Sequence, residues 1–412
     1  MQYGCIAEKL GHSFSAEIHA LIGGYDYRLR EVAKDDLDAF MQTRDFKGIN
    51  VTIPYKKSVI PYLHEMSDTA RRIGSVNTVV NRGGKLYGYN TDYFGMRSLI
   101  EENGIEISGK KVLILGTGGT SVTARVVAED LGAKDILIVS RRKTDGVITY
   151  DEAVSAHSDA EIIINTTPVG MYPENYASPI DVEKFRALEG VVDAVYNPLT
   201  TVLVQTAKSR GIKAVCGLYM LVAQAVRASE IFRDVEIPRS EIMRIYTQIV
   251  KMKQNIALTG MPACGKSTIG KLVAEILGRE FIDTDAEIVK RAGMPITDIF
   301  ATKGDKAFRD LETEVIRDVT KLSGVVIATG GGAILRDENV AALHQNCKVF
   351  FIDRPLEWLT PTSDRPTASD KEAIKQRYEE RYDRYISTAD EVINPTEDVE
   401  DNAKLIIERF KI

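Results

Sequence analysis

The sequence predicts an α/β fold with largely parallel sheets, and three observations support this prediction. Short apolar strand segments alternate with helical segments along the whole chain, which is the pattern of α/β layers. Two of the strands run directly into a glycine-rich turn and then a helix, at Gly116 and at Gly260. The composition, 44% hydrophobic and 27% charged, is that of a globular protein, and 412 residues allow two or three domains at roughly 150 residues each.

The predicted elements follow one another with short connections. Strands are expected at 2–7, 25–32, 47–51, 76–81, 111–115, 135–140, 161–165, 191–194, 212–215, 255–259, 325–329 and 348–352. Helices are expected at 15–22, 35–43, 119–131, 200–209, 218–232, 265–277, 303–321, 371–385 and 398–410. An amphipathic helix at about 239–252 gives way to a strand at 255, so the clearest boundary lies near 251–254. No Pro/Gly/Ser-rich spacer marks it, and the joint is therefore expected to be short.

Charge and patterning exclude several classes of protein. The net charge is −6 and no basic stripe is visible, which argues against nucleic acid as a partner. The longest apolar runs are far shorter than the ~20 residues that span a bilayer, and residues 1–10 do not resemble a signal peptide. The four cysteines are scattered without a CxxC pair, so a cytoplasmic chain with reduced thiols is expected. The oligomeric state cannot be read from the sequence.

The first glycine turn has the spacing Gly116-x-Gly118-x-x-Ser121, with Gly119 following Gly118. After a strand and before a helix, this variant of GxGxxG is typical of a dinucleotide site, although a tight turn without a ligand is an equal alternative. The next strand ends in Ser140-Arg141-Arg142-Lys143 and carries no carboxylate. Cations at this position favour the 2′-phosphate of NADP over the free ribose of NAD; a solvated basic loop is the alternative.

Polar side chains also gather at the ends of the strands that precede this turn. They are Ser13 and Ser15, Thr52 and Lys56, Asn77, and Asp92 in the run Asn90-Thr91-Asp92. Each one alone is more often a turn residue or a helix cap. Together they suit a small ligand with several hydroxyl groups.

These motifs resemble the shikimate dehydrogenase family from residue 1 to about 250. The resemblance extends to the segments Asn165–Met171, Asp193–Pro198 and Gly217–Gln224. It implies reversible reduction of 3-dehydroshikimate to shikimate by NADPH, with Lys56 and Asp92 as the catalytic pair. The positions that match substrate-binding residues are Ser13, Ser15, Thr52, Asn77, Tyr196 and Gln224. Those that match the NADP site are Gly116, Gly118, Gly119, Arg141 and Gly217, although the family often has Asn-Arg-Thr where this chain has Ser140-Arg141-Arg142.

The second glycine turn, Gly260-x-x-x-x-Gly265-Lys266-Ser267, is a complete Walker A pattern between a strand and a helix. This pattern predicts nucleoside triphosphate binding, with the Lys266 ammonium on the phosphates, the Ser267 hydroxyl on Mg²⁺ and Thr268 next in the helix. Ala263 stands in the middle of the loop, where related loops usually carry glycine, and Pro262 before it has no N–H group.

Several groups after this loop suit phosphoryl transfer to an anionic substrate. Asp283 and Asp285, at i and i+2 on a segment expected to be extended, would point the same way and share one cleft. One carboxylate could act near Mg²⁺ and the other could orient a hydroxyl nucleophile. Three glycines and separate arginines follow, each of which alone could be a turn or a surface charge: Arg309, Gly330–Gly332, Arg365 and Arg381.

As a set these residues resemble shikimate kinase over residues 255 to about 412. The resemblance implies that Asp285, Arg309, Gly331, Gly332 and Arg381 bind shikimate, with Asp285 orienting or deprotonating the nucleophile. It also implies that Asp283 acts near Mg²⁺ and that Arg365 belongs to a lid over the ATP phosphates. The expected cofactors are NADP(H) and Mg²⁺, with ATP as co-substrate.

The combined interpretation is a bifunctional enzyme in which the product of the first site is the substrate of the second. We expect an α/β substrate domain at 1–93 rejoined by helices near 219–250, a Rossmann-type NADP domain at 94–218 and a P-loop kinase domain at 255–412. Three alternatives stay open at this point. The dehydrogenase half could use quinate or NAD, the kinase half could act on another small polyol, or one half could be an inactive regulatory or scaffold module.

Overall fold

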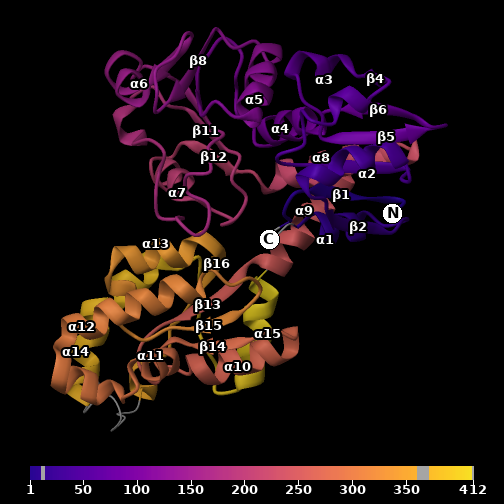
Figure 1. Cartoon of the computed structure of the whole chain (residues 1–412). Helices are drawn as coiled ribbons and strands as arrows, with labels where there is room; N and C mark the ends of the chain where they lie inside the picture. Colours follow the sequence, from indigo (N-terminus) through magenta and orange to yellow (C-terminus); the bar gives the residue numbers. More distant parts are fainter. Residues whose placement is uncertain (11–13, 360–370, 411–412) are drawn as a thin grey trace. The chain divides into compact units, whose positions relative to one another are not determined.

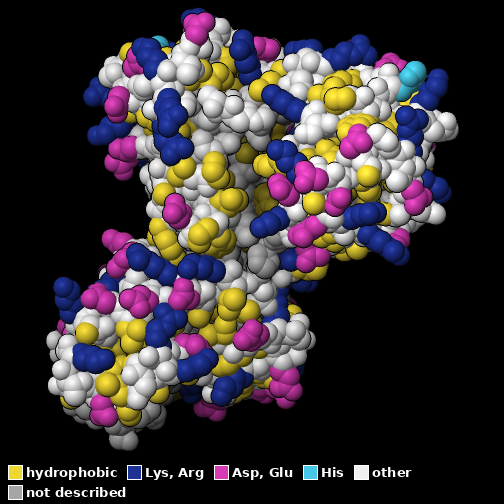
Figure 2. Space-filling model, in the orientation of Figure 1, with side chains coloured by type: hydrophobic (Ala, Val, Ile, Leu, Met, Phe, Trp, Pro, Cys, Tyr) yellow, Lys and Arg dark blue, Asp and Glu magenta, His cyan; other side chains and the backbone are white. Residues whose placement is uncertain are grey.

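The computed structural model describes residues 1–10, 14–359 and 371–410 (Figure 1). The chain divides into two compact units, Met1–Ile249 and Val250–Ile412, and each is described here by itself. None of the helices in these ranges is long and apolar enough to cross a membrane. Figure 2 shows Lys and Arg interspersed with Asp and Glu over the visible face of each unit.

The first sheet of unit 1 is mixed. Its order is β2-β1-β3-β5-β6-β4, made of β1 (Tyr3–Ala7), β2 (Tyr27–Glu31), β3 (Gly48–Val51), β4 (Glu65–Met66), β5 (Thr78–Arg82) and β6 (Lys85–Tyr89). β5 is antiparallel to both β3 and β6. Gly83 and Gly84, with positive φ angles of 60° and 83°, turn the chain back from β5 into β6. The second strand of this hairpin, β6, was not predicted from the sequence. Three helices also belong to this part of the chain: α1 (Ser15–Ile22), α2 (Leu37–Thr43) and α3 (Asp68–Ile73).

The second sheet of unit 1 is parallel, with the order β12-β11-β10-β7-β8-β9. Its strands are β7 (Lys111–Leu115), β8 (Asp135–Ser140), β9 (Val147–Thr149), β10 (Ile162–Asn165), β11 (Gly190–Asp193) and β12 (Lys213–Cys216). The strand order reverses between β7 and β10, so the sheet has the doubly wound arrangement of dinucleotide-binding folds. The turn at Gly116 leaves β7 at this switch point, which is where such folds bind their ligands.

Six helices accompany the two sheets of unit 1. They are α4 (Thr91–Glu102), α5 (Gly119–Asp130), α6 (Tyr150–Ala156), α7 (Val202–Ser209), α8 (Leu218–Arg233) and α9 (Ser240–Lys253), the last of which contains the unit boundary. α4 and α8 lie against each other (Figure 1). The C-terminal end of α8 also reaches the first sheet, since the Phe232 ring lies 5.6 Å from the Tyr3 ring of β1.

Unit 2 has one parallel sheet with the order β14-β15-β13-β16-β17. Its strands are β13 (Asn255–Thr259), β14 (Phe281–Asp283), β15 (Val326–Ala328), β16 (Cys347–Ile352) and β17 (Glu391–Ile393). Its helices are α10 (Lys266–Leu277), α11 (Thr284–Ala292), α12 (Ile296–Val319), α13 (Asp337–Asn346), α14 (Lys371–Thr388) and α15 (Val399–Arg409). α12 is interrupted at Gly304, whose φ of 82° and ψ of 171° are not helical.

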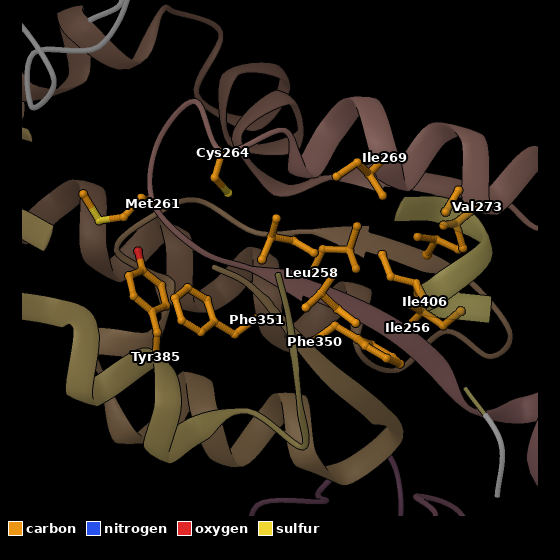
Figure 3. Close-up of a cluster of buried hydrophobic side chains, with 14 of the residues drawn as sticks. Ile256, Leu258, Met261, Cys264, Ile269, Val273, Phe350, Phe351, Tyr385 and Ile406 are labelled. Carbon is orange, nitrogen blue, oxygen red and sulfur yellow. The ribbon is translucent and has the colours of Figure 1, made fainter. Parts of the chain in front are cut away.

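The core of unit 2 supports the second glycine loop (Figure 3). β13 and β16 contribute Leu258 and Phe350, α10 contributes Val273, and α15 contributes Ile406; all four are almost completely buried. Burying such side chains stabilises the unit by about 1.5–3 kcal/mol each. β13 and α10 are thereby held rigidly on either side of the loop that joins them.

Candidate active sites

The first candidate site is an ion pair in unit 1. The Nζ of Lys56 lies 2.6 Å from Oδ2 of Asp92, and the two side chains are 25% and 15% exposed. Asp92 lies in the first turn of α4, where Asn90 caps the helix by accepting a hydrogen bond from the N–H of Tyr93. The pair is therefore fixed in place on the protein side and still open to a ligand.

A buried hydrogen-bond network holds the Asp92 carboxylate from behind. Asn77 Nδ2 donates to Oδ1 of Asp92 at 2.9 Å, and Asn77 Oδ1 accepts from the N–H of Thr91 at 2.7 Å. The Thr91 hydroxyl in turn donates to Oε1 of Gln224 on α8, at 3.4 Å. Two predicted substrate-binding residues, Asn77 and Gln224, are thus brought to the predicted catalytic pair.

The same network continues into the first sheet through residues that the sequence did not single out. Asn50 Nδ2 donates to Oγ1 of Thr78 at 3.1 Å, and Thr78 Oγ1 donates to Oδ1 of Asn77 at 3.1 Å. The Tyr27 hydroxyl donates to Oδ1 of Asn50 at 2.7 Å. Asn50 and Thr78 are close in sequence to Thr52 and Asn77, but only the pairing of β3 with β5 shows that they face each other.

The other predicted substrate-binding residues lie on separate elements of unit 1. Thr52 follows β3, and Ser15 opens α1 directly after Phe14. The Phe14 ring makes an edge contact with Tyr196 at 5.5 Å, so the start of α1 and the loop after β11 meet here. Burial raises the pKa of Tyr196, which keeps its hydroxyl protonated. Ser13 lies outside the described residues.

The first glycine turn forms an open cradle. Gly116 has a φ of 105°, and Gly118 caps the N-terminus of α5. A Cβ on Gly118 or Gly119 would meet nothing within 4 Å, whereas one on Gly217 would lie 2.3 Å from the carbonyl oxygen of Ala194. Unobstructed N–H groups at a helix N-terminus fit the pyrophosphate of a dinucleotide. Glycine is required at 217 for a different reason: the backbone of Ala194, just after β11, comes too close to leave room for a side chain.

The cations predicted to read the 2′-phosphate lie beyond the end of β8. Arg141 and Arg142 are exposed, while Lys143 pairs with Glu152 of α6. Two exposed guanidinium groups next to the cradle fit a phosphorylated ribose better than a free hydroxyl pair. The residues present therefore fit NADP(H).

The second glycine loop, which lies in unit 2, surrounds the Lys266 ammonium. Lys266 is 6% exposed, and its Nζ donates to the carbonyl oxygens of Gly260 and Met261 at 2.9 and 2.8 Å. A cavity of about 210 Å³ opens beside it and is lined by Ala263, Gly265, Lys266, Ser267, Thr268, Asp283, Asp285 and Thr329. Ala263 has a φ of 64°, so an alanine takes up the left-handed conformation that favours glycine.

The chemistry of this cavity fits Mg²⁺ with a nucleotide. The Ser267 hydroxyl donates to Oδ2 of Asp283 at 2.6 Å, which places two oxygen ligands side by side. Within the described ranges no group of three or more His, Cys, Asp or Glu side chains could hold a metal ion alone. Mg²⁺ is commonly held by one or two protein oxygens together with substrate phosphates, and Ser267 and Asp283 would be those ligands here.

A second cavity of about 600 Å³ adjoins the first. It is lined by Pro262, Asp283, Asp285, Ala286, Val289, Lys290, Pro295, Ile296, Phe300, Phe308, Arg309, Glu312, Gly330, Gly331, Gly332 and Arg381. Nη1 of Arg381 donates to the carbonyl oxygen of Gly331 at 3.2 Å, and a Cβ on Gly332 would lie 2.1 Å from Nη1 of Arg309. Glycine at 332 therefore leaves room for the guanidinium that faces the cavity.

The placement of the two carboxylates differs from the sequence prediction. Asp283 ends β14 and caps α11 by accepting from the N–H of Asp285 at 3.0 Å, whereas Asp285 lies in the first helical turn. The prediction of one extended segment was wrong, because the helix begins at Thr284. Both side chains nevertheless line both cavities. They are brought together because Asp283 caps the helix in which Asp285 lies, and not because both point the same way from an extended strand.

Glu312, a carboxylate on the cavity wall, was not predicted from the sequence. Its Oε2 lies 2.7 Å from Nη1 of Arg309, and its side chain is 1% exposed. Its Oε1 has no hydrogen-bond partner among the described residues, and burial raises its pKa. The available signal was the i, i+3 spacing of Arg309 and Glu312 on one helix.

Comparison with known proteins bears on both units. The family model described as shikimate dehydrogenase substrate binding domain matches residues 5–79, and the model described as shikimate kinase matches residues 262–411. A shikimate dehydrogenase (NADP(+)) of Clostridium perfringens is 37% identical over 265 residues, which covers 60% of this chain and 97% of that protein. The chain belongs to the shikimate dehydrogenase family. Its second unit is a shikimate kinase domain.

Solved shikimate dehydrogenases agree with this assignment over unit 1. A chorismate mutase/shikimate 5-dehydrogenase fusion protein from Clostridium acetobutylicum is 40% identical with a TM-score of 0.58, covering 60% of this chain and 96% of that one. Shikimate 5-dehydrogenase from Thermus thermophilus, solved with NADP(H) and shikimate, is 26% identical with a TM-score of 0.54 and covers 60% and 99%. The predicted α/β fold with a Rossmann-type sheet and a parallel P-loop sheet is confirmed.

The individual roles of the residues in this shikimate dehydrogenase and kinase chain stay predictions. The structure brings together Lys56, Asp92, Asn77 and Gln224 in unit 1, and Lys266, Ser267, Asp283 and Asp285 in unit 2. Arg365, predicted for the lid over the nucleotide, lies outside the described residues.

Proposed function

We propose that the chain catalyses two successive reactions. Unit 1 reduces 3-dehydroshikimate to shikimate with NADPH, and unit 2 transfers the γ-phosphoryl group of ATP to the 3-hydroxyl of shikimate. The observation that carries this proposal is the presence of a shikimate dehydrogenase unit and a shikimate kinase domain in one chain. A chain with one inactive half is not favoured, because the side chains predicted for catalysis, Lys56 and Asp92 in unit 1 and Lys266 and Asp285 in unit 2, are present.

In the reduction, the protein handles a proton. NADPH supplies a hydride to the carbonyl carbon of the substrate, and the carbonyl oxygen becomes negative as it arrives. Lys56 is placed to give its Nζ proton to this oxygen, which yields the hydroxyl of shikimate; the neutral amine then regains a proton from solvent. Asp92, held by Asn77, fixes the position of the ammonium.

In the phosphoryl transfer, the protein positions groups and stabilises charge. ATP and Mg²⁺ supply the phosphoryl group and neutralise part of its charge when bound. Arg309 and Arg381 are placed to hold the substrate carboxylate in the larger cavity. Asp285 lines both cavities and can accept the proton of the attacking hydroxyl, while Lys266 stabilises the charge on the phosphate oxygens.

A coupled assay tests both reactions at once. The purified chain with 3-dehydroshikimate, NADPH, ATP and Mg²⁺ should form shikimate 3-phosphate, with NADPH consumed in equal amount. Omission of ATP should stop the reaction at shikimate. Parallel reactions with quinate and NAD⁺ address substrate and cofactor choice; faster oxidation of quinate than of shikimate would contradict the assignment of unit 1.

Two further features belong to the proposal. We place the domain boundaries at 1–93 with 219–250, 94–218 and 255–412, supported by the separate sheets of unit 1 and by the division near Ile249. We also place the protein in the cytoplasm, supported by four cysteines that are all unpaired. Limited proteolysis and cell fractionation are the direct measurements.

A further inference from the structure

Tyr27 lies on β2, the edge strand of the first sheet of unit 1, although no sequence motif included it. β1 separates β2 from β3, so the Tyr27 side chain extends across one strand to donate to Oδ1 of Asn50 at 2.7 Å. The Tyr27 ring stacks on the His19 ring, with the centroids 3.7 Å apart and 12° between the planes. The tyrosine is therefore held in one place while its hydroxyl reaches into the interior of the sheet.

The Tyr27 hydroxyl remains protonated and can serve as a hydrogen-bond donor. Burial raises its pKa well above the ordinary value of 10. The neighbouring groups are uncharged as well, because burial raises the pKa of the Cys5 thiol to about 12 and lowers the pKa of His19 to about 3. The hydrogen bond from Tyr27 to Asn50 therefore keeps its direction near neutral pH.

From Tyr27 the hydrogen bonds run in one direction to the catalytic pair. Because Oδ1 of Asn50 accepts from Tyr27, its Nδ2 faces the other way and donates to Oγ1 of Thr78 at 3.1 Å. The Thr78 hydroxyl donates its single proton to Oδ1 of Asn77 at 3.1 Å. Asn77 Nδ2 in turn donates to Oδ1 of Asp92 at 2.9 Å. Four hydrogen bonds thus form a path from Tyr27 to Asp92 in which every intermediate residue accepts from one neighbour and donates to the next.

The middle of this path is buried, where bulk water does not replace a lost partner. Asn50, Asn77 and Thr78 are 8%, 4% and 0% exposed. Without the Tyr27 hydroxyl, the Asn50 amide can turn over, and Thr78 can then donate to Asn50 instead of to Asn77. Asn77 keeps another donor to its Oδ1, the N–H of Thr91 at 2.7 Å, so the carboxylate beyond it would be loosened and not released.

We propose that Tyr27 is a positioning residue for the Lys56–Asp92 pair and acts through this hydrogen-bond path. The proposal rests on the proposed reduction by unit 1 and adds a residue that is remote from the reacting atoms. One hydrogen bond of ordinary strength corresponds to a change in rate of about threefold to tenfold. The effect of losing the Tyr27 hydroxyl should therefore be smaller than that of losing Lys56 itself.

The test is a double-mutant cycle on the dehydrogenase reaction of the full chain. Stopped-flow absorbance measures the rate constant of the first turnover of NADPH with saturating 3-dehydroshikimate in the wild type, Tyr27→Phe, Thr78→Val and the double variant. Tyr27→Phe removes the hydroxyl but keeps the ring on His19, so we expect a rate about threefold to tenfold lower and an unchanged KM for NADPH. In the Thr78→Val background the path is already interrupted, and Tyr27→Phe should lower the rate no further.

Two variants serve as controls. Tyr25→Phe removes a hydroxyl that contacts Nδ1 of His19 and not Asn50, so the rate should stay unchanged. Thr78→Ser keeps the hydroxyl and should retain both the rate and its dependence on Tyr27. If Thr78→Val does not fold, the contrast between Tyr27→Phe and Tyr25→Phe decides.

Three results would overturn the proposal while leaving the proposed function intact. They are an unchanged first-turnover rate in Tyr27→Phe, the same fractional loss in the presence and absence of the Thr78 hydroxyl, and a loss confined to the KM for NADPH. A wild type that does not oxidise NADPH with 3-dehydroshikimate would instead refute the proposed function, and the role of Tyr27 with it.

Discussion

The Lys56 ammonium lies 2.6 Å from the Asp92 carboxylate, although 36 residues separate the two in the sequence. Asn77 holds the far oxygen of the same carboxylate, so the pair has a defined orientation and not merely proximity. An amine held in this way keeps a fixed position from which it can give a proton to a bound ligand. The proposed proton transfer in unit 1 depends on this contact between Lys56 and Asp92.

Replacement of either partner should remove the proton donor or release it. Lys56→Ala and Asp92→Asn are each expected to lower kcat for reduction by about 10²–10⁴-fold, the usual contribution of a positioned acid. The measurement is the rate of NADPH oxidation at saturating substrate. Lys57→Ala, at an exposed neighbouring position, is the matched control and should be nearly neutral. Unchanged reduction in Lys56→Ala would show that another group donates the proton.

Lys266→Ala should abolish phosphorylation and spare reduction. Its ammonium is the buried cation that the loop surrounds, and its loss leaves the phosphate oxygens without their charge partner. Both activities are measured on the same preparation, so the dehydrogenase rate reports on folding. Lys271→Ala, at an exposed position of the same helix, should retain both activities. Joint loss of both activities in Lys266→Ala would mean that the two units do not function independently.

Ala263→Gly should stabilise unit 2. The left-handed conformation costs an alanine about 1–2 kcal/mol, and the added freedom of glycine in the unfolded chain offsets about 0.4–1 kcal/mol. The expected net gain is on the order of 0.5–1 kcal/mol. Trp358 is the single tryptophan, so denaturant unfolding followed by its fluorescence reports on this unit. Ala274→Gly, inside α10, should instead lower the free energy of unfolding. A change in the same direction in both variants would contradict the explanation from backbone strain at Ala263.

The stability of unit 1 should depend on pH through Asp193. Burial raises the pKa of this carboxyl to about 6, above its ordinary value of 3.8. Between these two values the folded chain binds the extra proton, so this contribution to stability is present below about pH 4 and is lost as the pH rises through 6. The loss is on the order of 2–3 kcal/mol.

Asp193→Asn provides the measurement of this effect. The difference in free energy of unfolding between wild type and variant, taken from pH 4 to pH 7, should shift in favour of the variant as the pH rises. Asp181→Asn changes an exposed carboxyl of the same unit and is the matched control. A difference for Asp193→Asn that does not change with pH would show that the buried carboxyl is ionised throughout the range.

Glu312→Gln should weaken the substrate site of unit 2. The variant keeps the shape of the side chain but replaces the charged partner of Arg309, so the guanidinium that faces the cavity is held less firmly. A hydrogen bond to a charged group contributes about 1.5–3 kcal/mol, which predicts a KM for shikimate raised by roughly tenfold or more. The KM for ATP should change little. Glu314→Gln, two residues further and exposed, is the control; a larger effect on ATP than on shikimate would argue against this role.

Much of the fold follows from patterns within short segments. The strands that enter the two glycine loops occupy 111–115 and 255–259, as predicted, because a continuous apolar run and a glycine turn are both local signals. The hairpin at Gly83 and helix α4 were missed. In the sequence, Asn90-Thr91-Asp92 was interpreted as a helix cap, which Asn90 is, but the length of the helix that follows depends on its packing against α8.

The sites were predicted to the extent that each residue belongs to a motif. Three of the predicted site residues stand in short motifs whose residue types and spacing are visible in the sequence alone: Lys56, Asp92 and Lys266. Glu312 and Tyr27 do not, because each acquires its surroundings from contacts between distant elements: Glu312 from the cavity wall, and Tyr27 from its contact with Asn50 of β3. A sequence shows which groups a chain contains, whereas burial and orientation depend on the completed sheet.

The presence of both units in one chain also fixes their ratio. With separate polypeptides, a cell can adjust the amount of each catalyst by transcription or degradation. Here every copy that is synthesised adds one reducing centre and one phosphorylating centre, so expression cannot correct an imbalance between them. If the proposed function holds, the relative rates of the two steps must be set by kcat and KM alone, and selection on one unit constrains the other.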